Sequence, residues 1–161
     1  KLAAEIYAKA YNQESGTDIK IVRFFNVYGP GQESNWVVPI FLNKALKNEP
    51  ISVFGEGNQT RCFTYVEDIA EGVLTVFEKG KAGEAYNIGN NKPTTILELA
   101  QIVKEITKSK SEIKKLGFGK ETRLKEREIE YRVPDISRMK SLGWQPKTMI
   151  REGVKRMLEL N

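Results

Sequence analysis

Hydrophobic residues recur three or four positions apart in several stretches of the chain, which is the spacing of one helix face. In the first stretch Leu2, Ile6 and Ala10 share a face, and Gly16 follows as a helix stop. Further on, Thr95 and Glu98 have the spacing of a capping box at a helix N-terminus. The pattern predicts helices over residues 1–16, 37–48, 67–78 and 95–106, and two small helices near the C-terminal end, separated by the turn LGWQP.

Other hydrophobic runs are short and lack helical spacing, which favours strands. The run DIKIVRFF, residues 18–25, is nearly continuously apolar, as in a parallel strand that is buried on both faces. Shorter runs predict extended segments at 51–54, 61–66 and 84–90, and we expect residues 108–134 to be irregular with one or two short strands. The alternation of strands with helices indicates an α/β fold whose sheet is at least partly parallel.

The amino-acid composition excludes several kinds of catalytic and metal site. A chain of 161 residues, 40% of them hydrophobic, is sufficient for one packed domain. The absence of histidine excludes Ser-His-Asp and Cys-His catalysis and argues against a transition-metal site, so we expect no metal. The single cysteine, Cys62, excludes an internal disulfide, is consistent with a cytoplasmic protein, and is expected to be a small buried residue. No apolar run is long enough to cross a bilayer, so no membrane association is expected.

The net charge of +5 is compatible with several kinds of partner. The densest basic tract, residues 104–115, contains no aromatic residue on which a nucleic-acid base could stack. We therefore favour a solvated helix end over a nucleic-acid patch, and a phosphate-bearing small ligand would also suit a positive surface.

The segment RFFNVYGPGQ, residues 23–32, runs from a predicted strand straight into an asparagine, a tyrosine and a Gly-Pro-Gly turn. Because ligands of open α/β sheets bind beyond the carboxyl ends of the strands, this segment is expected to deliver polar groups to a ligand. None of the three G-x-G pairs in the chain has the third glycine of a dinucleotide-binding fingerprint. A dinucleotide would therefore find only a partial site here.

Four motifs, in order, carry a family resemblance: RFFNVYGPGQ, VFGEGNQTRCFTYVEDIAEGV, AYNIGN and LGWQP. Together they resemble the C-terminal half of the extended short-chain dehydrogenase/reductases, the nucleotide-sugar epimerases, dehydratases and decarboxylases typified by UDP-glucose 4-epimerase. The resemblance runs from Lys1 to about Gly153. It implies NAD as cofactor, with NADP as the alternative, a UDP-sugar or related nucleotide-sugar as ligand, and a homodimer when the enzyme is intact.

The resemblance also implies a division of the chain. Residues 1–29 and 61–89 would form the C-terminal part of a Rossmann-type NAD-binding domain, and residues 30–60 and 90–161 a small mixed α/β substrate domain. The family's N-terminal half, with its Gly-rich loop and catalytic tyrosine, would be a missing partner of this chain. Without it, we expect an apolar strand edge and a helix face to be exposed.

The implied cofactor contacts are Lys1, Phe25, Val27 and Tyr28. Lys1 would be the lysine of the family's Tyr-x-x-x-Lys pair, which holds the nicotinamide ribose and lowers the pKa of the tyrosine. On that basis Lys1 is the catalytic residue carried by this chain. The alternative is a surface lysine with no such role.

The implied substrate contacts lie in several segments. Arg61 matches the family's diphosphate-binding arginine, and the alternative is an arginine on a solvated turn. Asn26 would donate to substrate or else bond its own turn, and Trp36 would line the site or else lie in the core. The remaining candidates are Asn35 at a helix N-terminus, Val53 and Phe54 on a strand whose backbone would read the uracil, and Phe63.

One further family element is an arginine three residues before an aspartate, both of which contact the nucleotide. Alignment backward from Asp135 places these two positions on Lys125 and Glu128, with Arg127 close enough to substitute.

The function implied is part of an NAD-dependent UDP-sugar 4-epimerase, which transfers hydride at sugar C4 through a 4-keto intermediate. Nucleotide-sugar 4,6-dehydration and UDP-glucuronate decarboxylation are the alternatives on the same scaffold. A non-catalytic nucleotide-sugar-binding module is a second alternative, and nucleic-acid binding through the basic surface is a third.

Overall fold

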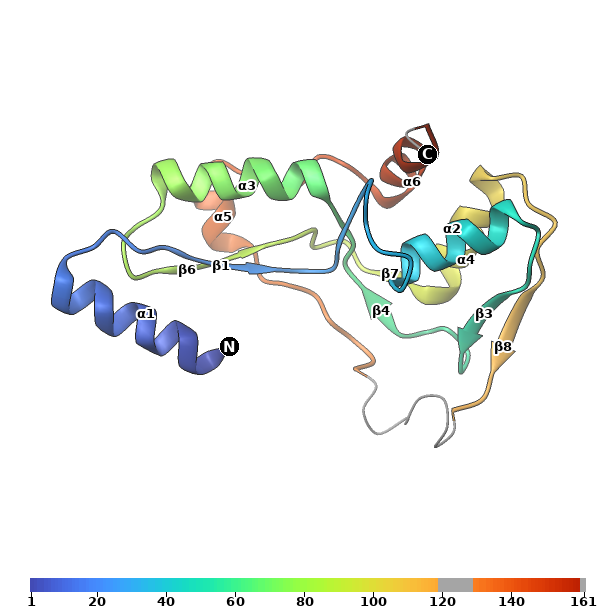
Figure 1. Cartoon of the computed structure of the whole chain (residues 1–161), viewed down its shortest axis with the longest axis horizontal. Helices are drawn as coiled ribbons and strands as arrows, with labels where there is room; N and C mark the ends of the chain where they lie inside the picture. Colours follow the sequence, from blue (N-terminus) through green and yellow to red (C-terminus); the bar gives the residue numbers. More distant parts are fainter. Residues whose placement is uncertain (119–128, 160–161) are drawn as a thin grey trace.

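The computed structural model describes residues 1–118 and 129–159 as an α/β arrangement, shown in Figure 1. The helices are α1 Leu2–Ser15, α2 Val37–Leu46, α3 Val66–Lys79, α4 Ile96–Ile106, α5 Ser137–Ser141 and α6 Ile150–Glu159. The strands are β1 Ile21–Phe24, β2 Val27–Tyr28, β3 Ile51–Phe54, β4 Thr60–Arg61, β5 Thr64–Tyr65, β6 Ala85–Ile88, β7 Thr94–Thr95 and β8 Ile113–Leu116. The predicted helices and main strands are confirmed, and β2 and β7 are elements that the sequence pattern did not predict.

The first layered unit is built on β1 and β6, which pair in parallel from Ile21 opposite Ala85 to Phe24 opposite Ile88. Helix α3 covers one side of this pair and α1 lies along the other side (Figure 1). A small core forms between α3, β6 and the segment around α5. Its buried members are Ile69, Val76, Tyr86, Ile88, Ile136, Met139 and Trp144.

The second unit packs α2, α4 and α6 around the parallel pair β3–β8, in which Ile51 lies opposite Ile113. The capping box predicted at α4 is confirmed, because Thr95 Oγ1 accepts from the Glu98 amide at 3.0 Å. Between the two units, β2 pairs in parallel with β5 and β4 pairs antiparallel with β7. Residues 135–144, predicted to belong with the substrate domain, contribute to the first core.

The prediction that β1 is buried on both faces is wrong for this chain. Ile21 and Val22 are half-buried, Arg23 is exposed, and Phe24 is 52% exposed. Among the described residues β1 has a strand partner on one edge only, so its other edge lacks cover. Helix α1 has no buried residue, and Leu2 and Tyr7 are more than 70% exposed.

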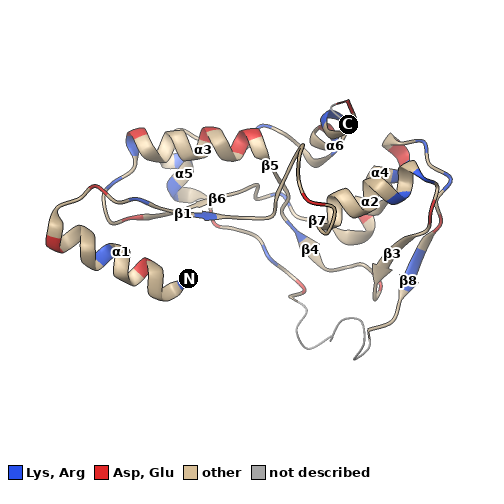
Figure 2. Cartoon of the chain, in the orientation of Figure 1, with Lys and Arg blue, Asp and Glu red and all other residues tan. Residues whose placement is uncertain are grey.

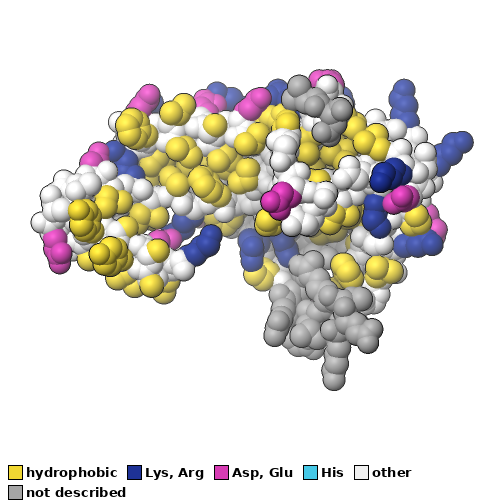
Figure 3. All heavy atoms as spheres, viewed as in Figure 1, with side chains coloured by type: hydrophobic (Ala, Val, Ile, Leu, Met, Phe, Trp, Pro, Cys, Tyr) yellow, Lys and Arg dark blue, Asp and Glu magenta, His cyan; other side chains and the backbone are white. Residues whose placement is uncertain are grey.

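The expectation of an exposed strand edge and helix face is therefore met. Figure 3 shows hydrophobic side chains gathered over α3 and along α1 on this side of the molecule. Their most exposed members are Leu2, Ile6 and Tyr7 on α1, and Leu74 and Phe77 on α3.

The remaining surface carries charges of both signs. Acidic and basic positions alternate along α1 and on the segments around α4 and β8 (Figure 2).

Cys62 is fully buried, and burial raises the pKa of its thiol to about 11, which confirms the prediction of a small buried residue. Within the described ranges no helix has the length and apolarity to cross a membrane, and no group of three His, Cys, Asp or Glu side chains could hold a metal ion.

Candidate functional site

The chain turns sharply where β1 ends, and asparagine makes that turn possible. Asn26 has a φ of 38°, in the left-handed region that asparagine tolerates better than most residues. Its backbone oxygen accepts from the Thr64 amide at 3.1 Å, and its side-chain nitrogen donates to the Cys62 carbonyl at 3.2 Å. The alternative in which Asn26 bonds its own turn is therefore not observed. The side chain instead joins the end of β1 to the segment between β4 and β5.

The buried side chain of Thr64 stabilises the same turn at the end of β1. The residue is fully buried, and its hydroxyl donates to the Phe25 carbonyl at 2.8 Å while accepting from the Asn90 amide at 2.8 Å. One hydroxyl thus connects the end of β1, the start of β5 and the loop after β6. It therefore helps to hold together the carboxyl ends of the parallel strands β1 and β6.

We expect Thr64→Val to destabilise the full-length protein by about 1–3 kcal/mol, because the Phe25 carbonyl and the Asn90 amide would lose a buried partner. Urea unfolding measures the change. Thr75→Val is the matched control, since the Thr75 hydroxyl donates to the Glu71 carbonyl in the preceding turn of its own helix α3. Equal effects of the two substitutions would contradict the assignment.

A hollow of about 690 Å³ opens at the end of β1, beside this turn. All four predicted cofactor contacts border it, together with Phe24, Asn26, Gln32, Trp36, Val37, Val38, Phe63 and Arg132. We call it the strand-end hollow. Gln32 donates to the Val27 carbonyl at 2.9 Å, and its side-chain oxygen is buried without a hydrogen-bond partner among the described residues. An orphan acceptor in the wall favours a ligand that carries a donor.

A second hollow of about 480 Å³ adjoins the first, and Asn26, Trp36, Val37, Phe63 and Arg132 border both. We call it the helix-side hollow, because α2 supplies much of its wall. Six of the predicted substrate contacts line it: Asn26, Asn35, Trp36, Phe54, Arg61 and Phe63. The other lining residues are Ile40, Phe41, Lys44, Ser52, Gln59, Ile96 and Ile129.

The lining of the two hollows is cationic. Lys1 and Arg132 border the first, and Lys44, Arg61 and Arg132 border the second. No acidic side chain lines either hollow within the ranges that the structure describes. An anion with an apolar or planar portion would therefore be complementary to both charge and walls.

Arg61 lines the helix-side hollow and also bonds the backbone of the segments beside it. It is half-buried on β4, and its guanidinium donates to the Thr60 carbonyl at 2.7 Å and to the Ile129 carbonyl at 2.6 Å. The alternative of an arginine on a solvated turn is therefore wrong. Trp36 is 59% exposed at the N-terminal end of α2, so the alternative of a core tryptophan is also wrong.

Two predicted site residues have buried side chains. Val53 is fully buried in the core and does not line either hollow, although its neighbour Phe54 lines the second. The contact predicted for Val53 is through its backbone, and it stays a prediction. Tyr28 borders the strand-end hollow but is 1% exposed, with its hydroxyl against Gly153 of α6. Burial raises the pKa of Tyr28, so its hydroxyl stays neutral. Lys125, Arg127 and Glu128 lie outside the described residues.

The sequence patterns missed Arg132, which borders both hollows. The sequence does contain a signal for it. Arg132 stands three residues before Asp135, which is the spacing of the family element that was assigned to Lys125 and Glu128. Lys44 and Gln32 were also missed. Each stands in a helix or a turn where its residue type is ordinary, so no local pattern marked it.

Three kinds of comparison with known proteins agree. Residues 1–89 match the NAD dependent epimerase/dehydratase family. The chain is 37% identical over 161 residues to UDP-glucuronic acid decarboxylase 1 of Arabidopsis thaliana, covering 98% of this chain and 35% of that protein. It is 39% identical to a putative UDP-glucose 4-epimerase of Methanocaldococcus jannaschii, covering 98% of this chain and 50% of that protein.

A solved structure gives the same result for the fold. The UDP-glucose 4-epimerase of Thermotoga maritima, crystallised with UDP-glucose, superposes with a TM-score of 0.89 at 32% identity, over 99% of this chain and 51% of that one. The chain thus spans about a third to a half of the length of these relatives. The predicted Rossmann-type α/β class and the resemblance stated from the motifs are confirmed. By its sequence match and by its fold, the chain belongs to the NAD dependent epimerase/dehydratase family.

Proposed function

We propose that this chain is part of an NAD-dependent enzyme that acts on nucleotide-sugars, with UDP-sugar 4-epimerisation as the first candidate reaction. The observation that carries the proposal is the pair of adjoining hollows, whose lining is cationic and which share Asn26, Trp36 and Arg132. Two ligands held in two hollows with a common wall would meet there. Such an arrangement suits a cofactor and a substrate that exchange a hydride.

The helix-side hollow suits a nucleoside diphosphate. Arg61, Arg132 and Lys44 supply positive charge for a diphosphate, and guanidinium groups pair with phosphate oxygens in a planar fork. Phe54 and Ile96 supply an apolar wall for a base. The N-terminus of α2, which has no side-chain cap at Trp36, would add backbone N–H donors and the positive end of the helix dipole.

The strand-end hollow suits the nicotinamide end of NAD. Lys1 would donate to ribose hydroxyls, Phe25 would form a wall beside the ring, and the unpaired oxygen of Gln32 could accept from an amide or hydroxyl of the ligand. When bound, NAD would accept and return a hydride. This chain holds no Gly-rich loop, so it would bind only part of the dinucleotide.

The residues of this chain would then act by binding and orientation. Asn26, on the common wall, would donate to a sugar hydroxyl near the reacting carbon. The positive charge of Lys1 would favour deprotonation of an acid placed beside it, by raising the stability of the charged form. Neither residue supplies a proton acceptor, so the catalytic base would come from another part of the protein.

We also propose that the remainder of the enzyme covers the free edge of β1 and the exposed apolar residues of α3. The support is the exposure of Phe24, Leu74 and Phe77 and the half-length match to relatives. The division into a cofactor domain, residues 1–29 and 61–89, and a substrate domain, residues 30–60 and 90–161, stays part of this proposal. The homodimer is expected to form through α1.

Decarboxylation of UDP-glucuronate and 4,6-dehydration are the closest alternatives. Relatives at similar identity carry the names UDP-glucuronic acid decarboxylase and dTDP-D-glucose 4,6-dehydratase, the latter 37% identical in Homo sapiens. A non-catalytic nucleotide-sugar-binding module is the alternative from another functional class.

The test is to incubate the full-length protein separately with UDP-glucose, UDP-glucuronate and dTDP-glucose in the presence of NAD⁺, and to identify products by NMR. We expect UDP-glucose to be converted to UDP-galactose. Release of CO₂ from UDP-glucuronate, or loss of water from dTDP-glucose, would replace the epimerase assignment by one of the alternatives. Binding of UDP without any turnover would support the non-catalytic module, and retention on nucleic acid alone would overturn the proposal.

A further inference from the structure

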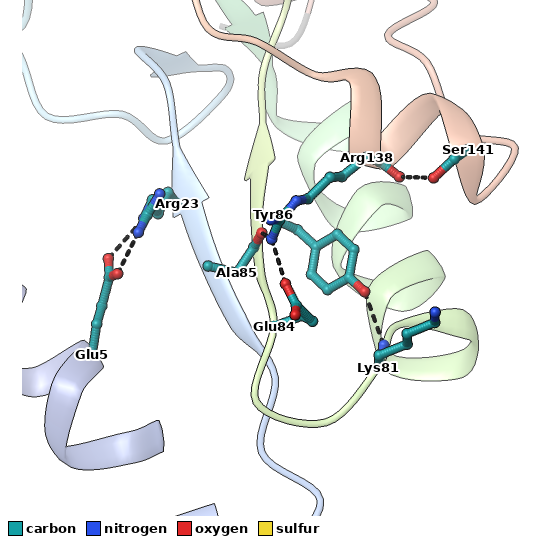
Figure 4. A network of polar contacts seen from close by, with 8 residues as sticks. All are labelled: Glu5, Arg23, Lys81, Glu84, Ala85, Tyr86, Arg138 and Ser141. Carbon is teal, nitrogen blue, oxygen red and sulfur yellow. Dashed lines mark hydrogen bonds and ion pairs between the residues drawn. The ribbon is translucent and has the colours of Figure 1, made fainter. Parts of the chain in front are cut away.

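An ion pair joins the exposed helix α1 to strand β1. Figure 4 shows Glu5 of α1 and Arg23 of β1 facing each other across the gap between the two elements. Arg23 Nε donates to Glu5 Oε1 at 2.8 Å and its terminal nitrogen Nη2 donates to Oε2 at 2.5 Å. Two parallel charge-assisted bonds fix orientation as well as distance. The hydrogen bond from Arg23 lowers the pKa of the Glu5 carboxyl, so the pair stays ionised at neutral pH.

Few other contacts hold this helix to the described part of the protein. Helix α1 has no buried residue, so it gains little from burial of its apolar face. Its C-terminal end is tied down by Asn12 and Ser15, which bond the backbone and side chain of Thr17. The Glu5–Arg23 pair is the corresponding polar tie for the N-terminal half, where the helix would otherwise pivot about its end at Gly16, a residue with a φ of 68°.

Both partners of the pair stand next to the wall of the strand-end hollow. The Glu5 amide donates to the Lys1 carbonyl at 3.1 Å, so Lys1 lies one helical turn from Glu5. Arg23 directly precedes Phe24 and Phe25, which border the same hollow as Lys1. The ion pair therefore connects α1 and β1, the two elements next to which Lys1 and the pair Phe24 and Phe25 border this hollow.

We propose that Glu5 and Arg23 act as a positioning pair that sets Lys1 over the strand-end hollow and thereby determines how tightly the cofactor binds. The inference rests on the proposed function, since it takes the strand-end hollow to be the nicotinamide site. Neither residue lines that hollow, so both act through Lys1 and are not catalytic residues.

The experiment measures the dissociation constants of NAD⁺ and of UDP by calorimetry in the full-length protein and its variants. We expect Glu5→Gln and Arg23→Gln each to weaken NAD⁺ binding roughly tenfold, the scale of one charge-assisted bond. UDP binding should change less than about twofold, because the helix-side hollow has no wall from α1. The double variant should be no weaker than either single variant, since the two side chains act as one unit.

A control and a second readout separate positioning from loss of stability. Glu14→Gln removes a carboxylate from the same helix that forms no ion pair with another described residue, and it should leave both affinities unchanged. Amide hydrogen exchange in the first turns of α1, with no ligand present, should become faster in Glu5→Gln and Arg23→Gln but not in Glu14→Gln.

The outcomes distinguish this inference from the proposed function. Wild-type protein that binds UDP but not NAD⁺ would overturn the cofactor assignment and the positioning role with it. Wild-type protein that binds both ligands, with single variants that bind NAD⁺ as tightly, would overturn the positioning role alone. Equal weakening of NAD⁺ and UDP, or losses that multiply in the double variant, would also count against a positioning pair.

Discussion

Replacement of Lys1 by methionine in the full-length protein is expected to slow hydride transfer roughly 100-fold and to weaken NAD⁺ binding, the largest effect of any substitution in this chain. Lys1 borders the strand-end hollow from the N-terminus of α1, and methionine keeps much of its length while removing the charge and its three donors. The measurement is single-turnover reduction of enzyme-bound NAD⁺ at saturating UDP-sugar, followed by the absorbance of NADH at roughly 340 nm.

The matched control is Lys9→Met, two turns along the same helix, which removes a lysine that borders a separate small polar depression and neither of the two hollows. Its rate should remain within about twofold of the wild type. If Lys1→Met is as active as Lys9→Met, then Lys1 has no role in the reaction and the surface-lysine alternative is correct.

Replacement of Arg132 by methionine is expected to weaken UDP-sugar binding by roughly 10- to 100-fold. Its side chain lies on the wall common to the two hollows, so its guanidinium can reach a diphosphate in the helix-side hollow. Lost bonds to a charged phosphate have a larger cost than bonds between neutral groups. Calorimetric titration with UDP measures the loss, and titration with uridine separates the phosphate contribution from that of the base.

Arg151→Met is the control for charge alone, because Arg151 on α6 pairs with Glu105 away from both hollows. Uridine should bind Arg132→Met and wild type with similar affinity. Equal loss of affinity for uridine and UDP would show that Arg132 supports the shape of the site, and that its charge does not contact phosphate.

The helices were predictable because their signals are local. The capping box of Thr95 and Glu98 and the αL stop at Gly16 involve residues no more than four positions apart. The strands β1 and β6 were also predictable, since each has a run of apolar residues. By contrast β7 is two residues long and exists only because Thr94 and Thr95 pair with Arg61 and Thr60, more than thirty positions away.

The candidate site was predictable only in part, because some of its residues lie in a contiguous motif and others are brought together by long-range packing. The motif RFFNVYGPGQ correctly indicated that residues 25–28 lie past a strand end, and these residues do border the strand-end hollow. The burial of the Tyr28 side chain was not foreseeable, because a two-residue periodicity does not say which face of a strand meets the core. Arg132 was not identified because the spacing of an arginine three residues before an acidic residue does not by itself distinguish Arg132 and Asp135 from Lys125 and Glu128.

Backbone conformation at caps and turns, helix faces and the α/β class follow from neighbours along the chain, and they could be inferred before any coordinates were known. The family could be inferred as well, because its motifs are contiguous. The meeting of Lys44, Arg61 and Arg132 around one hollow could not, since these residues are up to 88 positions apart and their distances depend on how α2, β4 and the segment before α5 pack. The same is true of the Glu5–Arg23 pair, which forms only because α1 returns along the face of the strand that follows it.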